Sequence, residues 1–240
     1  MAEEVTAGIY DIPIGIVHAY LIADDGLTMI DSGYPGETER ILTAVTQLGK
    51  KAADLKNVVL THYHVDHMGG LAALKGASGA TTYAHPADVP YIQGTKEHEG
   101  YFIRSFVDRL VAPIWGRRLR RYRQILEVAP VDHGVADGQE LPFSGGLKVI
   151  HTPGHTPGHI SVLMRPKKVL FVGDAAASVF GLRAPVGAFF GLATADVDQA
   201  KQSFRKIAEL DFDIACFGHG PVLKGQANVA FRRCVEKAAR

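Results

Sequence analysis

Three histidines and one aspartate lie within six residues of this chain, in Thr61-His62-Tyr63-His64-Val65-Asp66-His67-Met68-Gly69-Gly70. The apolar run 58–60 comes directly before them and predicts the end of a buried strand, whereas Leu71 begins a helical pattern. We therefore expect these side chains on a loop that leaves a strand end. Imidazole and carboxylate groups are the usual ligands of zinc and similar divalent ions. A metal site is the preferred interpretation, because imidazoles this close would repel one another once partly protonated.

The composition sets the class of protein. With 240 residues, 47% of them hydrophobic, the chain is long enough to bury a large core. A net charge of +1 gives no bias toward nucleic acid or membrane surfaces, and no apolar run approaches the length of a membrane span. The acidic start 1–4 lacks the features of a secretory signal, and the only cysteines are Cys216 and Cys234. We expect a cytoplasmic protein with a small-molecule partner, although the two cysteines could still pair.

The first third of the chain alternates strands and helices after an opening hairpin. Strands are expected at 9–10, 17–22 and 27–30, with a turn at Asp24-Asp25-Gly26. A helix is expected from Pro35 to Leu48, a second helix near 69–75 and a strand near 80–84. This order predicts α/β layering with mixed strand directions.

The middle of the chain is less regular, and the last third returns to strands and helices. Prolines interrupt 86–128, but a helical apolar face is expected from residue 100 onward, followed by a segment rich in arginine. That basic segment is either a solvated helix face or a lid that anchors an anionic group. Further elements are expected as strands at 147–150, 160–164, 169–172 and 214–217, and as helices at 195–210 and from 226 onward.

Three more strand ends carry metal-ligand side chains: His155, Asp174 and His219. Each lies next to a glycine, which allows the backbone to approach an ion closely. Strand ends that meet at one edge of a sheet are where α/β proteins place their sites. Together with the first cluster they make five histidines and two aspartates, enough for two ions that share a carboxylate. A single structural zinc would use four ligands and favour cysteine, and neither cysteine is near.

In these motifs the sequence resembles the metallo-β-lactamase superfamily of metallohydrolases. The resemblance rests on His62-x-His64-x-Asp66-His67, on 152–156, on Gly173-Asp174, on 218–220 and on Met29-Ile30-Asp31-Ser32-Gly33. It implies a four-layer αββα sandwich of two mixed β-sheets with a dinuclear site at one edge. It also implies a single domain over 1–240, with a helical insertion at about 86–128.

The resemblance assigns a role to each site residue. His62, His64 and His155 would hold one metal ion. Asp66, His67 and His219 would hold the other, and Asp174 would bridge the two. Asp31 would orient ligands from behind, and His159 would support the loop that carries His155. The other histidines are expected to be structural, with the first two nearest the expected site: His18, His85, His98, His133 and His151.

The resemblance also implies the chemistry. Two divalent ions, zinc in preference to iron or manganese, would share a hydroxide that attacks an ester, thioester or lactone, with Asp66 as proton acceptor. A glyoxalase II-like thioesterase and a lactonase are the nearest alternatives. However, Ala177 stands where acyl-homoserine lactonases carry a tyrosine. Only about twenty residues follow His219, so the glutathione-binding segment of glyoxalase II is missing or replaced. An iron-dependent sulfur dioxygenase and a non-catalytic metal-binding module remain as alternatives of another class.

The segment 98–123 is expected to cover the active site and help select the substrate. An inserted segment of this length is often a lid or binding loop, and its apolar face needs a surface to cover. Together with a second apolar stretch, it would wall a substrate pocket of Phe102, Phe106, Phe189 and Phe190. The competing interpretation is a homodimer interface through Phe102, Phe106 and Trp115.

Overall fold

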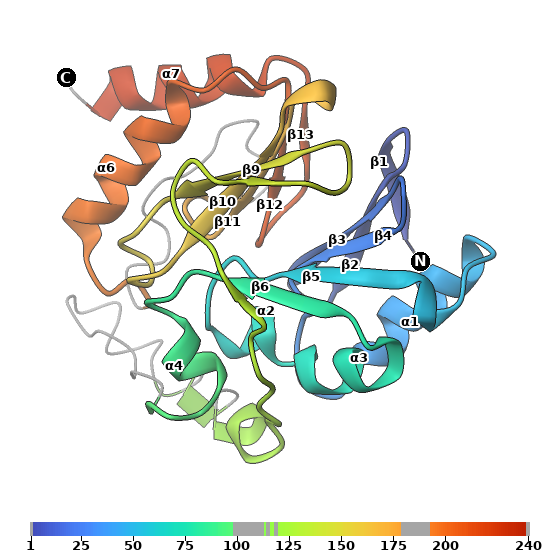
Figure 1. Cartoon of the computed structure of the whole chain (residues 1–240). Helices are drawn as coiled ribbons and strands as arrows, with labels where there is room; N and C mark the ends of the chain where they lie inside the picture. Colours follow the sequence, from blue (N-terminus) through green and yellow to red (C-terminus); the bar gives the residue numbers. More distant parts are fainter. Residues whose placement is uncertain (1, 98–112, 114–115, 118–119, 179–192, 239–240) are drawn as a thin grey trace.

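Two β-sheets pack face to face and helices cover their outer faces in the computed structural model of the chain (Figure 1). The structure describes residues 2–97, 113, 116–117, 120–178 and 193–238. Each sheet is built from one continuous half of the chain, so the interface between the sheets is also the interface between the two halves.

The first sheet contains seven described strands in chain order, and its early strands form antiparallel hairpins. From β4 onward the neighbouring strands run parallel, so their carboxyl ends meet at one edge. The strands are β1 (Glu3–Thr6), β2 (Ile9–Ile14), β3 (Val17–Ala23), β4 (Leu27–Ile30), β5 (Leu55–Val59), β6 (Thr81–Ala84) and β7 (His133–Gly134). The expected hairpin turn at Asp24-Asp25-Gly26 joins β3 to β4.

The second sheet contains six described strands in the order β13-β12-β11-β10-β9-β8. Its one parallel pair among these is β11 with β12, which brings two more carboxyl ends to the same edge. The strands are β8 (Glu140–Leu141), β9 (Leu147–His151), β10 (Ile160–Met164), β11 (Val169–Gly173), β12 (Ile214–Phe217) and β13 (Leu223–Lys224). The short strands β1, β7, β8 and β13 lie outside the elements expected from sequence.

Helices cover the outer faces and connect the strands. They are α1 (Thr38–Gln47), α2 (Val65–Met68), α3 (Leu71–Ser78), α4 (Val89–Ile92), α6 (Val197–Ala208) and α7 (Ala227–Ala238), with 3-10 turns η1 (Ala52–Asp54) and η2 (Arg165–Lys167). The expected helix at 35–48 begins later, at Thr38, because Gly36 has a φ of 80° and closes a turn before it. Asp196 begins α6 by accepting hydrogen bonds from the backbone N–H groups of Asp198 and Gln199.

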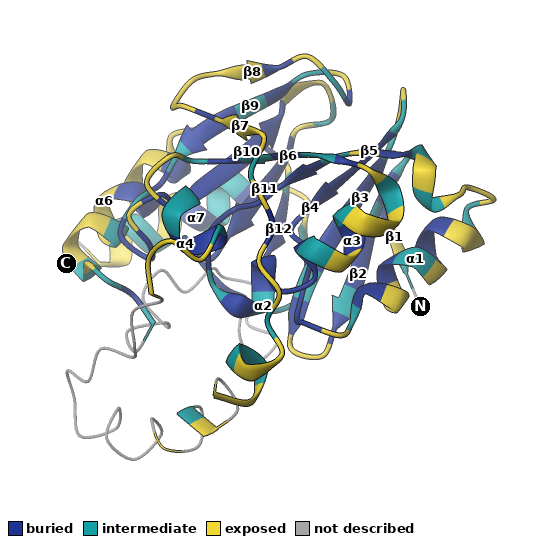
Figure 2. Cartoon of the chain, turned by 60° about the horizontal axis from the view of Figure 1, so that its bottom comes forward, coloured by how far each residue is buried: buried dark blue, intermediate teal, exposed yellow. Residues whose placement is uncertain are grey.

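Three buried apolar clusters hold these layers together. One fills the space between the sheets and includes Tyr20, Val59 and Phe171. A second lies between the first sheet and helices α1 and α3, and a third lies between the second sheet and helices α6 and α7. In Figure 2 the strands are mostly buried and the helices expose their outer sides. The layers therefore follow the expected order of helix, sheet, sheet and helix.

The structure corrects the expected position of two site residues. Asp66 and His67 lie on the one-turn helix α2 and not on a loop, and α3 starts only at Leu71. Gly69 and Gly70 lie between α2 and α3, in close contact with Pro35 and Ser32. A Cβ atom on Gly70 would lie 2.3 Å from the carbonyl oxygen of Ser32, so only glycine allows this close approach. The expected helix near 69–75 corresponds to α3, and the glycine contact separates it from α2.

Much of the expected insertion at 86–128 falls outside the described residues. The structure describes α4 and a helical segment at 120–124 in this region. The expected pocket residues Phe102, Phe106, Phe189 and Phe190 lie outside the described part of the chain, as do His98 and Trp115. Within the described part, no helix has the length and apolarity to cross a bilayer.

Candidate metal centre

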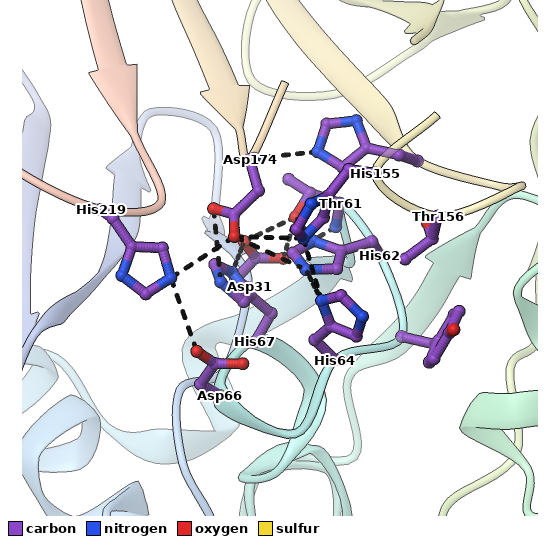
Figure 3. Close-up of polar contacts among 12 residues, drawn as sticks. Asp31, Thr61, His62, His64, Asp66, His67, His155, Thr156, Asp174 and His219 are labelled. Carbon is purple, nitrogen blue, oxygen red and sulfur yellow. Dashed lines mark hydrogen bonds and ion pairs between the residues drawn. The ribbon is translucent and has the colours of Figure 1, made fainter. Parts of the chain in front are cut away.

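Polar residues that follow five different strands come together at one edge of the sandwich (Figure 3). Asp31 follows β4, and the stretch from His62 follows β5. On the second sheet, His155, Asp174 and His219 follow β9, β11 and β12. Within the described part of the chain, all seven expected ligands fall into three overlapping groups: His62, His64 and His155; His62, His67 and Asp174; and Asp66, His67 and His219. In each group the ligand atoms lie within 4.8 Å of one another.

The first group is a triangle of ring nitrogens. His64 Nδ1 lies 3.1 Å from His62 Nε2 and 2.9 Å from His155 Nε2. Burial, reinforced by the neighbouring imidazoles, holds the pKa values of His62 and His64 well below the usual range. The two rings are therefore neutral and present lone pairs. Zinc–nitrogen bonds of 2.0–2.1 Å in a tetrahedron place two nitrogens about 3.3 Å apart, so this spacing suits one ion.

Asp174 lies between this triangle and the group of Asp66, His67 and His219, which is called the second group from here on. Its Oδ2 atom is 3.3 Å from His155 Nε2 and 3.4 Å from His219 Nε2, and its Oδ1 atom is 3.5 Å from His67 Nε2. Asp66 completes the second group, with its Oδ2 atom 3.5 Å from His219 Nε2. One carboxylate thus faces ring nitrogens of both groups, as a bridging ligand requires (Figure 3).

The charges of the second group are strongly coupled. Burial acts to raise the pKa of Asp174, but His219 and His67 outweigh it and hold the pKa well below its usual range. Burial acts to lower the pKa of His219, yet Asp174 and Asp66 raise it to about 9. The pKa of His67 is raised in the same way, chiefly by Asp174 and Asp31. Without a metal, protons on these two rings supply the positive charge that the carboxylates demand.

Asp31 determines which nitrogen of two ligand rings faces the site. It is buried, with a φ of 63°, and its Oδ2 atom accepts a hydrogen bond from Thr61 Oγ1 at 2.8 Å. Because the Thr61 hydroxyl has a single proton, its oxygen is left to accept from His62 Nδ1 at 3.0 Å. Asp31 also accepts directly from His67 Nδ1 at 2.9 Å. Both rings therefore turn Nε2 toward the centre, and on His67 that nitrogen becomes a ligand when it gives up its proton.

His219 and His159 are oriented by other partners. His219 Nδ1 donates to the carbonyl of Ile16 at 3.1 Å, which leaves its Nε2 atom for a ligand role. His159 Nε2 accepts from the backbone N–H of Asp174 at 2.9 Å, so its Nδ1 donates to Thr152 Oγ1 at 2.8 Å. His159 thus supports the backbone of Asp174 and does not face the centre.

Two further observations support a site for divalent cations. His67 Nε2 and Asp174 Oδ1 are buried and face each other, but neither has a hydrogen-bond partner among the described residues. Gly218 lines the same space, and a Cβ atom there would lie 2.2 Å from Asp174 Oδ1. A buried nitrogen and a buried oxygen thus face a space that only glycine at position 218 leaves open. This arrangement suits zinc or a similar ion.

The remaining described histidines lie outside the three groups. His18 Nδ1 is 2.8 Å from a carboxylate oxygen of Asp11. His85 and His151 stack on each other with ring centroids 4.0 Å apart, and His133 stacks on the ring of Tyr83. Each has a local structural contact of the kind expected for it.

Sequence reasoning missed Asp88, which is 0% exposed and contacts both ligand loops. Its carboxylate accepts hydrogen bonds from Tyr63 N, Thr156 Oγ1 and Gly158 N. Burial raises its pKa to about 7, although these three donors oppose the shift. The one sequence signal was an aspartate just after the strand at 81–84 and before Pro90, which is equally typical of a helix start.

Comparisons with known proteins agree with this geometry. A family model described as the metallo-beta-lactamase superfamily matches residues 12–219. The chain is 27% identical over 241 residues to the probable metallo-hydrolase YflN of Bacillus subtilis (strain 168), covering 93% of this chain and 88% of that protein. It is 30% identical over 158 residues to the hydroxyacylglutathione hydrolase GloC of Haemophilus influenzae, covering 64% of each. The crystal structure of the metallo-beta-lactamase family protein TTHA1429 from Thermus thermophilus has the same fold. Its TM-score is 0.72 at 18% identity, covering 98% of this chain and 81% of that chain.

Proposed function

The chain belongs to the metallo-beta-lactamase superfamily, and we propose that it is a dinuclear metal-dependent hydrolase of an ester, thioester or lactone bond in a small molecule. The observation that carries this proposal is the position of Asp174. Its two oxygens lie within 3.5 Å of ring nitrogens from both ligand groups. A centre for one ion would have no need of a carboxylate placed in this way.

In this proposal each half of the centre holds one divalent ion. His62, His64 and His155 hold the first, Asp66, His67 and His219 hold the second, and Asp174 bridges them. Two such ions lower the pKa of a shared water toward neutrality and polarise the carbonyl of the substrate. Zinc is the first choice because it favours nitrogen and oxygen donors of this kind, and iron and manganese are the alternatives.

Asp66 is proposed as the proton acceptor. Although burial acts against ionisation, its contact with His219 and the charge of His67 hold the pKa of Asp66 well below the usual range, so the carboxylate is ionised at neutral pH. Asp66 is also only partly buried, unlike His62, His67 and Asp174. The carboxylate of Asp66 would take the proton of the attacking water, while Asp31 keeps the ring of His67 in the tautomer that faces the centre.

A thioester is the favoured substrate bond. The relative named hydroxyacylglutathione hydrolase acts, by its name, on such a bond. Ala177, three residues after Asp174, is buried and offers no proton donor to a departing alkoxide. A thiolate, with a pKa of about 8.5, leaves without such help, whereas an alcohol of a lactone does not. These two observations are the support for proposing a thioesterase before a lactonase.

The proposal extends to the setting of the enzyme. We propose that the enzyme is cytoplasmic, because thiols stay reduced there and the chain carries only two cysteines, Cys216 and Cys234. Its partner would be the small-molecule substrate and neither nucleic acid nor membrane. Whether it forms a homodimer is decided by light scattering on the purified protein.

The test is metal analysis combined with a matched substrate panel. Protein reconstituted with zinc, iron or manganese is assayed against a thioester and an oxygen ester with the same acyl group, then against lactones and phosphodiesters. The proposal expects two metal ions per chain and fastest cleavage of the thioester, lost on chelation and restored by metal. One iron per chain with oxygen uptake on a persulfide would identify a sulfur dioxygenase. Two bound metals without turnover of any substrate would identify a binding module.

A further inference from the structure

Asp88 stands where an aspartate normally caps a helix, but its side chain does something else. It is the residue before α4, and an aspartate there usually accepts hydrogen bonds from the first N–H groups of its own helix. No such bond is formed. The carboxylate is instead fully buried between two loops that carry metal ligands. Burying a carboxylate costs free energy unless hydrogen bonds compensate, so the hydrogen-bond partners of Asp88 indicate its role.

The partners of Asp88 belong to both loops of the three-histidine group. Oδ2 accepts from the backbone N–H of Tyr63, at 3.2 Å, and from Thr156 Oγ1, at 2.6 Å. Oδ1 accepts from the backbone N–H of Gly158 at 2.7 Å. Tyr63 lies between His62 and His64 in sequence, and Thr156 follows His155. One carboxylate therefore ties together two ligand loops that leave different sheets.

Two further features show that this contact is built into the fold. A Cβ atom on Gly158 would lie 2.6 Å from Asp88 Oδ1, so the close approach depends on glycine at this position. The ring of Tyr63 stacks on that of Tyr91 in α4, with centroids 4.1 Å apart and planes 11° from parallel. The start of α4 is thus fixed to the His62–His64 loop by a side-chain stack as well as by Asp88.

We propose that Asp88 is a positioning residue that sets the distance between His64 and His155, and thereby the affinity of the ion that His62, His64 and His155 hold. The nitrogens of His64 and His155 are 2.9 Å apart, across the interface of the two sheets. The ligands of the second group have separate supports, Asp31 for His67 and the Ile16 carbonyl for His219. Loss of Asp88 therefore affects one ion more than the other. This inference rests on the proposed dinuclear centre.

The test is Asp88→Asn, which keeps the volume but turns one acceptor oxygen into a donor. In either orientation of the amide, the new N–H₂ group faces a backbone N–H, so at least one of the ties to the ligand loops is lost. Metal affinity is measured by competition with a chromogenic chelator, using zinc, and the geometry by the visible spectrum of the cobalt-substituted protein. Supporting groups of this kind change metal affinity by about 10–100-fold. We expect that loss for one of the two ions and a change within about twofold for the other.

The matched control is Asp132→Asn. Asp132 also accepts a backbone hydrogen bond, from Thr82, and it lies on no ligand loop. It should leave both metal affinities and the cobalt spectrum unchanged. A His219→Ala background, in which only the three-histidine side remains intact, assigns the weakened ion: Asp88→Asn should still reduce its affinity there. If Asp88→Asn fails to fold, Thr156→Val removes one of the three ties and should weaken the same ion to a smaller degree.

The outcomes separate this inference from the proposed function. If the wild-type protein binds fewer than two ions, the dinuclear proposal is wrong, whatever Asp88 does. If the wild type binds two ions and Asp88→Asn weakens both equally, or only lowers the melting temperature of the metal-free protein, then Asp88 is merely structural and the inference is overturned.

Discussion

Gly218→Ala should damage the metal centre while leaving the fold intact. The added Cβ atom would lie 2.2 Å from Asp174 Oδ1 and 2.7 Å from His67 Cε1. Ordinary contacts of such an atom begin near 3.4 Å, so the bridging carboxylate must move by about 1 Å. The backbone of Gly218 does not need a positive φ, and its hydrogen bond to Gly173 involves no side chain. The perturbation is therefore steric and is confined to the space beside Asp174 and His67, where the second ion is proposed.

The size of the effect follows from that displacement. Metal–ligand distances tolerate deviations of about 0.2 Å, several times less than the shift that alanine demands. A misplacement of about 1 Å at a reacting centre costs about 100-fold in rate. We expect kcat/KM to fall by at least about 100-fold, which is about 3 kcal/mol, and the affinity for one ion to fall with it. The assay combines metal analysis by mass spectrometry with thioester hydrolysis and with thermal unfolding of the metal-free protein.

Gly76→Ala is the matched control. Gly76 lies inside α3 with an ordinary backbone conformation, and a Cβ atom there would meet nothing within 4 Å. Metal content and activity should not change, and the helix should gain up to about 1 kcal/mol of stability. If Gly218→Ala protein retains two ions and activity within threefold of wild type, the space beside Gly218 is not the metal centre and the geometric argument fails.

Three further predictions concern carboxylates. Asp174→Asn should reduce the metal content to about one ion per chain and the activity by about 100–1000-fold, because a neutral amide cannot balance two dications; near-normal activity would remove Asp174 from the bridging role. Asp31→Asn should weaken metal binding by about 10–100-fold in chelator competition, because the amide N–H₂ group must face either the backbone N–H of Thr61 or the Nδ1–H of His67, and one of these bonds is lost; affinity within twofold of wild type would contradict this. Asp88 has a pKa of about 7 when folded against an ordinary 3.8, so the folded state keeps a proton that the unfolded state has released. The unfolding free energy of the metal-free wild type, relative to Asp88→Asn, should therefore fall by up to about 4 kcal/mol as the pH rises from about 4 to about 7. Urea unfolding at several pH values measures this, and two curves that stay parallel would contradict it.

The fold and the residues of the candidate metal centre could be predicted from the sequence because both follow from local patterns. The candidate ligands lie just after strand ends, and three of the seven adjoin a glycine, so the topology brings them to one edge. The expected αββα fold is confirmed by the family match and by the structural comparison with TTHA1429. The expected helix near 69–75 is present as α3, whereas α2 and the contact of Gly69 and Gly70 with 32–35, a segment distant in sequence, were not predicted.

What sequence reasoning missed depends on contacts between distant segments. Asp88 contacts residues 25 to 70 positions away along the chain, and no periodicity marks such a contact. The hydrogen bonds that run from His62 to Thr61 and from Thr61 to Asp31 likewise depend on the positions of three side chains, which the sequence does not give. The predicted pocket residues Phe102, Phe106, Phe189 and Phe190 lie outside the described residues, and the pocket remains a prediction.

The division of the chain into two sheets has a consequence for how the molecule is held together. Residues 62–67 come from the half that forms the first sheet, and His155, Asp174 and His219 come from the half that forms the second. Each proposed ion takes ligands from both halves. If both proposed ions bind, they would cross-link the two halves, and chelation should weaken the contact between the halves at this edge of the sandwich. For a protein severed between its halves, we expect metal to strengthen a reassembly that already rests on the apolar contacts between the two sheets.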